Sequence, residues 1–179
     1  MSQIPISSAM TLASDLGFPD PFTTSPGWVE RYGPNEVSQF TGAEMIAEKW
    51  NLSREEMEDF AIESHTRALK AQADGRFEAE IAPLEGLTFD EGPREPNVEK
   101  IRSLRTLVEG GRLTAACASQ ISDASASILI ASEQAVKDHG LTPRARIHHM
   151  SVRGDDPIFM LTAPIPATRY ALEKTGLTM

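Results

Sequence analysis

The run from Thr114 to Ser132, TAACASQISDASASILIAS, constrains the fold of this chain more than any other stretch. Small side chains crowd around the chain's single cysteine, Cys117. The end of the run, Ser127–Ala131, is a short, continuous apolar stretch of the kind that forms a strand buried in a sheet. We therefore expect this part of the chain to contribute to an α/β layer.

The pattern downstream of Arg112 supports that expectation, because predicted strands and helices alternate there. Serine at position 132 and prolines from position 164 favour helix starts, and Gly140 and Gly176 favour helix ends. The predicted strands are residues 113–117, 127–131 and 145–152, and the predicted helices are residues 132–140 and 164–176.

The first half of the chain is predicted to be mostly helical. Thr41 with Glu44 and Ser53 with Glu56 each have the spacing of a capping box, so helices are expected to start there and to end near Trp50 and Gly75. The second helix has an apolar face, which we interpret as ordinary core. Further expectations are packed loop over residues 1–40 (Phe18, Phe22, Trp28 and Tyr32), a strand at 77–82, and a short helix from Val98 to Gly110.

Composition excludes several classes of function. The net charge of −9 argues against a nucleic-acid-binding surface. No apolar run reaches the length of a membrane span, and no histidine or cysteine cluster has the spacing of a metal site. One cysteine cannot form an internal disulfide, so a reducing, cytoplasmic setting is expected.

Cys117 allows two interpretations. A nucleophilic thiol needs a base or a helix N-terminus nearby, whereas a free cysteine also behaves as a small, buried apolar residue. The sequence identifies no base for it, so the structural interpretation is favoured. Ser119 could reach the amide of a ligand, although it has no identifiable base either.

Several ordered motifs along the chain resemble those of the acyl-CoA thiolases. The small-residue run resembles the family's Thr-Ala-Gly-Asn-Ala-Ser-Gly pattern, and Asp90-Glu-Gly-Pro-Arg94 resembles its Asp-Glu-x-Pro-Arg. Further matches, in order, are Met1–Pro5, Ser53–Ala61, Gly75–Phe77, Gly140–Arg146 and Pro164–Lys174. The family's His-Met-Gly segment is replaced by Ser38-Gln39-Phe40, which suggests a different acyl preference.

The resemblance implies an α/β fold: a mostly helical loop subdomain followed by part of a mixed-sheet layer. It assigns residues 1–112 to the CoA-binding loop domain, 113–142 to the end of the N-terminal half, and 143–179 to the start of the C-terminal half. Residues 113–179 alone would leave sheet edges open, so we expect this half to be poorly ordered, to pair with another copy, or to be completed by other segments.

The resemblance also implies a set of residues that contact coenzyme A, which would be a substrate and not a cofactor. Arg94 aligns with an arginine beside the nucleotide, and Met160 with a methionine beside the acyl end. Ala115, Ser119 and Ile121 align with residues that line the pantetheine chain. Cys117 aligns with a position that is often asparagine.

The function implied is that of a thiolase, in which a cysteine thiolate takes an acyl group from a 3-oxoacyl-CoA and a second CoA accepts it. The segments that carry the family's catalytic cysteines and its Gly-His-Pro motif have no counterpart in these 179 residues, so we expect no catalytic residue here and no activity from the chain alone. The intact enzyme would be a homo-oligomer, a dimer or tetramer. The alternative is a non-catalytic CoA-binding or assembly module completed by another polypeptide.

Overall fold

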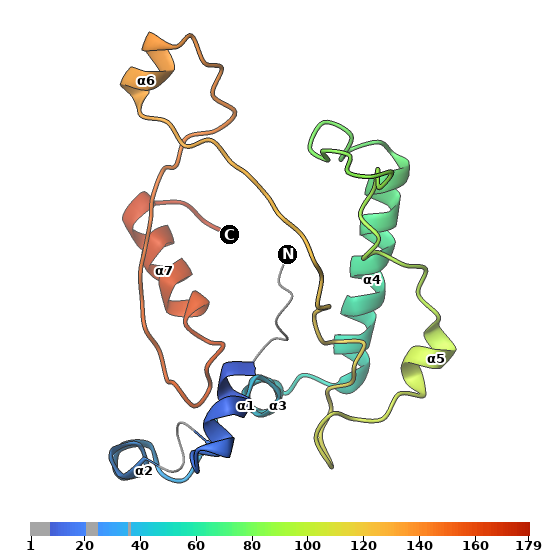
Figure 1. Cartoon of the computed structure of the whole chain (residues 1–179), viewed down its shortest axis with the longest axis vertical. Coiled ribbons are helices and arrows are strands. Elements are labelled where there is room, and N and C mark those ends of the chain that lie inside the picture. The colour runs from blue at the N-terminus through green and yellow to red at the C-terminus, as the bar shows by residue number, and fades with distance from the viewer. Residues whose placement is uncertain (1–7, 21–24, 36) are drawn as a thin grey trace. The chain divides into compact units, whose positions relative to one another are not determined.

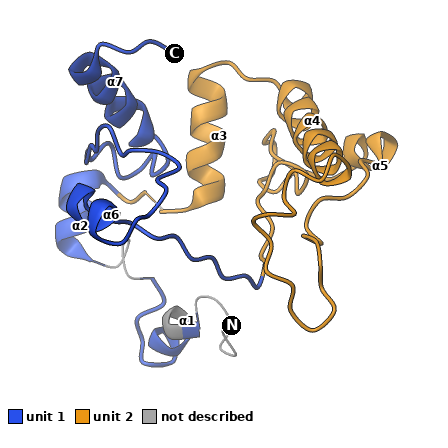
Figure 2. Ribbon diagram, turned by 90° about the horizontal axis from the view of Figure 1, so that it is seen from above, with its two compact units in different colours: residues 1–33, 123–179 blue, residues 34–122 orange. Residues whose placement is uncertain are grey.

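A computed structural model of the chain describes residues 8–20, 25–35 and 37–179. These residues form two compact units, drawn in different colours in Figure 2. Unit 2 is Pro34–Ser122, and unit 1 combines Met1–Gly33 with Asp123–Met179. The motif Met1–Pro5 and Phe22 lie outside the described residues. The three domain ranges implied by the resemblance stay predictions.

Unit 2 is built on three helices: α3 (Gln39–Lys49), α4 (Arg54–Ala73) and α5 (Val98–Arg102). Figure 1 shows α4 as a long rod with the short α5 beside it. The predicted capping box of α4 is confirmed, because Ser53 and Glu56 each accept a backbone N–H of the other. Gly75 follows the helix with φ of 69°, a left-handed conformation that glycine adopts without strain.

The capping box predicted for the preceding helix is wrong. Helix α3 begins at Gln39, two residues before Thr41, and its N-cap is Ser38, whose side chain makes no capping hydrogen bond. Thr41 and Glu44 therefore lie inside the helix. The Glu44 carboxylate is left free of the helix start and reaches a segment far along the chain.

The predicted strands do not form in the part of the chain that the structure describes. The β-pairings found there are two isolated bridges, Leu84 with Leu87 and Thr106 with Thr114. Residues 77–80 form turns, since the N–H groups of Glu80 and Ile81 both donate to Phe77 O. A strand needs a neighbouring strand for its backbone hydrogen bonds, and without one these segments stay extended or turn.

Unit 1 contains four helices within its described residues: α1 (Ser8–Asp15), α2 (Pro26–Tyr32), α6 (Glu133–Asp138) and α7 (Pro164–Thr175). The expected loop over residues 1–40 thus contains the helices α1 and α2 and the start of α3. Phe18 is 65% exposed, against the expectation that it packs. The helix boundaries set by Ser132 and Gly176 are confirmed, because Ser132 Oγ accepts the Ala135 N–H and Gly176 has φ of 70°.

The extended segments of unit 1 expose apolar side chains. Ile128, Leu129 and Ile130 are between 71% and 85% exposed, and Met150 and Val152 are 79% and 89% exposed. These are the segments predicted as sheet strands, and the structure pairs neither of them with another strand within the described residues. No helix of the described residues is both long and apolar enough to cross a membrane.

Candidate functional site

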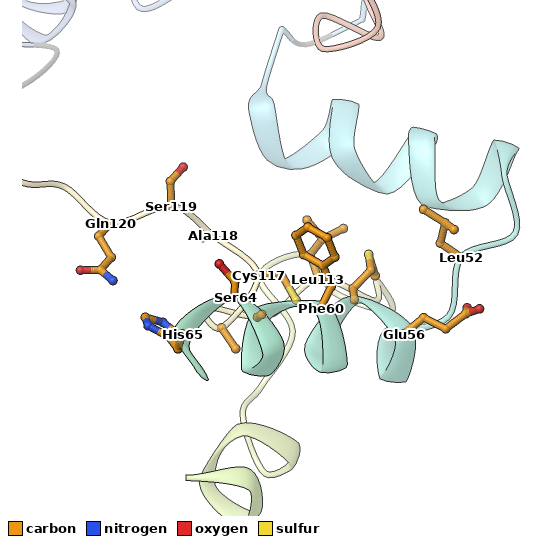
Figure 3. A pocket seen from close by; sticks show the side chains of 13 residues that line it. Leu52, Glu56, Phe60, Ser64, His65, Leu113, Cys117, Ala118, Ser119 and Gln120 are labelled. Atoms are coloured by element: carbon orange, nitrogen blue, oxygen red, sulfur yellow. The ribbon is translucent and has the colours of Figure 1, made fainter. Parts of the chain in front are cut away.

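An open groove of about 690 Å³ runs along α4 in unit 2 (Figure 3). One side is the face of α4, and the other is the chain segment from Leu113 to Gln120, here called the wall segment. Leu52, just before α4, lines the groove near the start of this helix. The lining residues are Leu52, Glu56, Met57, Phe60, Ala61, Ser64 and His65 from the helix side and Leu113, Ala116, Cys117, Ala118, Ser119 and Gln120 from the wall segment.

The α4 side of the groove corrects the expectation that this apolar face is ordinary core. Phe60 is 78% exposed, and Met57 and Ala61 beside it are only half-buried. In the described residues the buried apolar side chains are Ala47 and Leu113. A row of apolar residues open to solvent along a groove is typical of a surface that binds a ligand or another segment.

The base of the wall segment is tied to both neighbouring helices through Glu58. This carboxylate is 1% exposed, and its oxygens accept hydrogen bonds from Arg54 Nε at 2.8 Å and from Arg102 Nη1 at 2.9 Å. Thr114 Oγ1 donates to Glu58 Oε1 at 3.4 Å. Arg102 also pairs with Asp59. Glu58 thus joins α4, α5 and the wall segment in one charged cluster.

The charges in this cluster shift two pKa values. Burial works to raise the pKa of Glu58, but the hydrogen bonds and positive charges of Arg102 and Arg54 outweigh it and hold that pKa below its usual value. Hydrogen bonds to Glu58 and Asp59 raise the pKa of Arg102 further above its ordinary value. The cluster is therefore a network of ion pairs that stabilises the base of the groove.

The start of the wall segment is held by Glu44 of α3. The backbone N–H groups of Arg112 and Leu113 both donate to Glu44 Oε1, each at 2.7 Å. The next residues along the wall segment are Leu113 and Thr114, which are 8% and 0% exposed. The wall segment therefore starts from a buried position that its hydrogen bonds to Glu44 hold in place.

The loop around Arg94 is fastened to the opposite end of the groove. His65 Nδ1 accepts the Arg94 backbone N–H at 3.4 Å, and Gln120 Nε2 donates to Gly92 O at 3.0 Å. Gln72 Nε2 donates to Asp90 O at 2.7 Å. Because His65 and Gln120 line the groove, these bonds bring the Asp90–Arg94 motif to its end.

The structure brings some of the predicted contact residues together. Ser119 lines the groove, and Arg94 lies at the same end through its bond to His65. Ala115 and Ile121 flank lining residues but are themselves exposed, Ile121 by 86%. Met160, with φ of 58°, belongs to unit 1. The contact of these five residues with coenzyme A stays a prediction.

Cys117 sits in the wall segment as a half-buried residue. Its sulfur lies 3.9 Å from Thr114 Oγ1, and its backbone N–H donates to Thr114 O at 3.0 Å. Among the described residues no histidine hydrogen-bonds this sulfur, so the structure identifies no imidazole base for it. The described residues also contain no group of three His, Cys, Asp or Glu side chains able to hold a metal ion.

Three residues that organise the groove escaped the sequence analysis. Glu44 matched a capping pattern, and the pair Glu58 and Arg102 gave no signal because they lie 44 positions apart. The sequence does carry a signal for the Glu44 anchor in Gly110-Gly111, a pair that also has the pattern of a helix end. A second glycine in succession, beyond the one that the turn requires, indicates a close approach of another group.

Comparison with known proteins identifies the family. Residues 34–134 match the family described as "Thiolase, N-terminal domain". The match covers more than half of the chain and contains the whole groove and its anchors. The chain belongs to the thiolase family, and it is homologous to thiolases that act as acyltransferases.

Individual relatives agree. The chain is 62% identical over its whole length to the steroid 3-ketoacyl-CoA thiolase FadA6 of Mycobacterium tuberculosis, and 42% identical over 76% of its length to the 3-ketoacyl-CoA thiolase of Vibrio cholerae. Its fold is similar to that of human mitochondrial 3-ketoacyl-CoA thiolase, solved in complex with CoA, with a TM-score of 0.67 and 36% identity over 77% of this chain. The thiolase-like fold predicted from the sequence is thus supported, although the described residues form none of the predicted strands.

The coverage of these relatives is partial. The chain spans 45% of the Mycobacterium tuberculosis protein, 38% of the Vibrio cholerae protein and 36% of the human chain.

Proposed function

We propose that this chain is part of an acyl-CoA thiolase and that the groove of unit 2 binds coenzyme A. The wall segment and Ser119 take the pantetheine chain, and Arg94 takes the nucleotide at the end of the groove. The whole enzyme carries out thiolysis of a 3-oxoacyl-CoA or the reverse condensation of two acyl-CoA molecules. Coenzyme A is then a substrate, and no other cofactor is needed.

The observation that carries this proposal is the meeting of Ser119 and the Asp90–Arg94 motif at one end of the groove. These two segments are joined by the bond from Gln120 to Gly92. The wall segment is made of small residues, which allow a narrow amide-containing chain to lie close to the backbone. Ser119 supplies a hydroxyl for an amide of that chain, and Arg94 a positive charge for a phosphate.

Isothermal titration calorimetry of the 179-residue chain with CoA tests the proposal. We expect binding by the wild type and a loss of at least about tenfold in affinity for Ser119→Leu, because the larger side chain fills the groove. Ser125→Leu is the matched control, since Ser125 is exposed and lies outside the groove-lining residues. Absence of heat up to about millimolar CoA, or equal affinities for both variants, would contradict the proposal.

We further propose that the acyl group handled by the whole enzyme is derived from a steroid. The relative that is 62% identical over the full chain is a steroid 3-ketoacyl-CoA thiolase, whereas the general 3-ketoacyl-CoA thiolase is only 42% identical over three quarters of it. Competition between a steroid-derived and a straight-chain acyl-CoA for the complete enzyme tests this point. A preference for the straight chain would contradict it.

The 179 residues by themselves are proposed to be inactive. Cys117, the single thiol, has no activating histidine among the described residues. An assay of CoA-dependent cleavage of a 3-oxoacyl-CoA by the purified chain is expected to show no turnover. Turnover that disappears in a variant of one of the chain's own residues would overturn this.

The alternative is a CoA-binding or assembly module that another polypeptide completes, and the exposed Ile128–Ile130 segment favours it. Native mass spectrometry distinguishes the cases. A completed module is isolated together with a second polypeptide, whereas a homo-oligomer, dimer or tetramer, has a mass that is a multiple of the mass of one chain. A cytoplasmic location stays a prediction from the single cysteine.

A further inference from the structure

Glu44 spans from one helix of unit 2 to the start of the wall segment. It lies in the middle of α3, and it reaches residues 68 and 69 positions further along the chain. Both N–H groups converge on the same oxygen, Oε1, at 2.7 Å. Hydrogen bonds to an ionised carboxylate are about twice as strong as those between neutral groups, so this contact holds the backbone firmly.

Gly111 makes the contact possible. A Cβ atom at position 111 would lie 2.8 Å from Glu44 Cδ, which is closer than real Cβ atoms come, and 3.0 Å from Val108 O, which is a tight contact. At the neighbouring Gly110 nothing lies within 4 Å of where a Cβ atom would be, but its φ is 70°. One glycine therefore serves the turn, and the other serves the approach of the carboxylate.

The anchor acts on the groove because of where it sits. Leu113, whose N–H it holds, is buried and lines the groove. The wall segment continues from there through Cys117 to Ser119. Glu44 is not itself a lining residue, so it can affect a ligand only by holding the wall segment.

We propose that Glu44 is a positioning residue of the coenzyme A groove, which sets the position of the wall segment and through it the affinity for CoA. This inference rests on the proposed function in one respect, namely that the ligand is CoA. The position of the wall segment can be measured without any ligand, since Cys117 is the only cysteine of the chain and a site-specific probe.

Loss of Glu44 is expected to free one end of the wall segment and leave the rest of unit 2 in place. The bond from Thr114 to Glu58 and the contacts of Glu58 with both arginines do not involve Glu44. The wall segment then keeps its attachment to α4 but loses its attachment to α3. Such a change loosens the groove without removing the helices.

The experiment compares Glu44→Ala, Glu44→Gln and the control Glu48→Ala in the full 179-residue chain. Glu48 lies one turn further along α3 and is exposed. The readouts are the dissociation constant for CoA and the rate of Cys117 alkylation by iodoacetamide without ligand. Far-UV circular dichroism checks that the helices remain.

We expect Glu44→Ala to weaken CoA binding about tenfold and to raise the alkylation rate several-fold, because two charge-assisted hydrogen bonds are lost. Glu44→Gln keeps an oxygen that can accept both N–H groups, so it should stay within about threefold of the wild type. Glu48→Ala should match the wild type. Wild-type-like behaviour of Glu44→Gln would show that the hydrogen-bond acceptor at position 44 positions the wall segment.

Equal behaviour of Glu44→Ala and Glu48→Ala in both readouts would overturn the inference, as would a loss in Glu44→Gln as large as in Glu44→Ala. A second measurement needs no variant: the amide protons of Arg112 and Leu113 should exchange slowly in the wild type, and fast exchange of both would also overturn it. No CoA binding by the wild type, together with faster alkylation in Glu44→Ala, contradicts the proposed function while supporting the positioning role.

Discussion

Arg102 Nη1 donates to Glu58 Oε2 at 2.9 Å and thereby joins the end of α5 to the second turn of α4. Arg54 completes the pair from the other side, with its Nε on Glu58 Oε1 and its Nη2 on Leu104 O at 2.7 Å. Few apolar side chains of the described residues are buried. The buried Glu58 carboxylate and its two arginines therefore contribute a large share of the interactions that hold unit 2 together. The stability of unit 2 should therefore depend on Glu58 more than on any exposed charge.

Replacement of Glu58 by alanine should lower the free energy of unfolding by about 2–3 kcal/mol, because it leaves the arginines without their buried acceptor. Urea unfolding followed by circular dichroism measures this. Glu63→Ala is the control, since Glu63 pairs with Arg67 on the exposed side of α4 and should change stability by less than about 0.5 kcal/mol. Similar losses in both variants would contradict the role of the cluster.

The same cluster predicts an acid dependence of stability. The pKa of Glu58 is lowered in the folded chain, so its contribution is fully present above the ordinary value of 4.5 and is lost as the pH falls through the lowered folded value. Unfolding in urea at about pH 7, about pH 5.5 and about pH 3 should show a loss only at the lowest pH.

Glu58→Gln separates this effect from the other carboxylates. The pKa of Glu56 is also lowered, by the backbone and side-chain hydrogen bonds of Ser53, and it contributes with the same sign. The variant should therefore show a smaller acid loss than the wild type, though not a flat profile. An acid loss unchanged by Glu58→Gln would remove Glu58 from the explanation.

Ser53 and Thr41 each lie three residues before a glutamate, but replacing them by alanine should change the free energy of unfolding by different amounts. Ser53 Oγ accepts the Glu56 N–H at 3.2 Å, and the Ser53 N–H donates to Glu56 Oε2 at 2.7 Å. Ser53→Ala should cost about 1 kcal/mol in the free energy of unfolding, because α4 loses its cap. Thr41→Ala should cost less than about 0.5 kcal/mol, because Thr41 lies inside α3. Equal costs would show that Thr41 caps a helix after all.

The contrast between Ser53 and Thr41 shows which features of the fold can be predicted from the sequence. Local signals predicted α4, α6 and α7 with their caps, since a cap depends on a few neighbouring residues. The same pattern at Thr41 misled, because Ser38 starts the helix earlier and Glu44 has a partner 68 residues away. Strands failed for a related reason: apolar runs such as Ile128–Ile130 need a partner strand, and local sequence does not supply one.

The site follows the same division. The Ser119 segment and the Asp90–Arg94 motif were found as patterns, and the structure joins them through Gln120 and Gly92. The groove itself could not be predicted, because its α4 face has the spacing of an ordinary core face. The exposure of Phe60 in the structure is what distinguishes a groove face from a core face.

Replacing Gly110 and replacing Gly111, the two glycines before the wall segment, should each destabilise the chain, but for different physical reasons. Gly110→Ala should cost about 1 kcal/mol in unfolding free energy from its φ of 70° alone, since nothing lies near its Cβ position. Gly111→Ala should cost more, because its Cβ would meet Glu44. In a double-mutant cycle, Glu44→Ala should relieve part of the Gly111→Ala loss and none of the Gly110→Ala loss. Additive losses in both cycles would contradict the close approach.

Cys117 provides the last prediction, on whether the thiol has a chemical role. Its sulfur lies 3.9 Å from a hydroxyl and has no hydrogen bond from a histidine in the described residues, so it should act as a small side chain of the wall segment. Cys117→Ser should leave the CoA dissociation constant within about twofold, whereas the bulkier Cys117→Phe should weaken binding at least about tenfold by filling the groove. Loss of CoA binding in Cys117→Ser would contradict this purely structural role of the thiol.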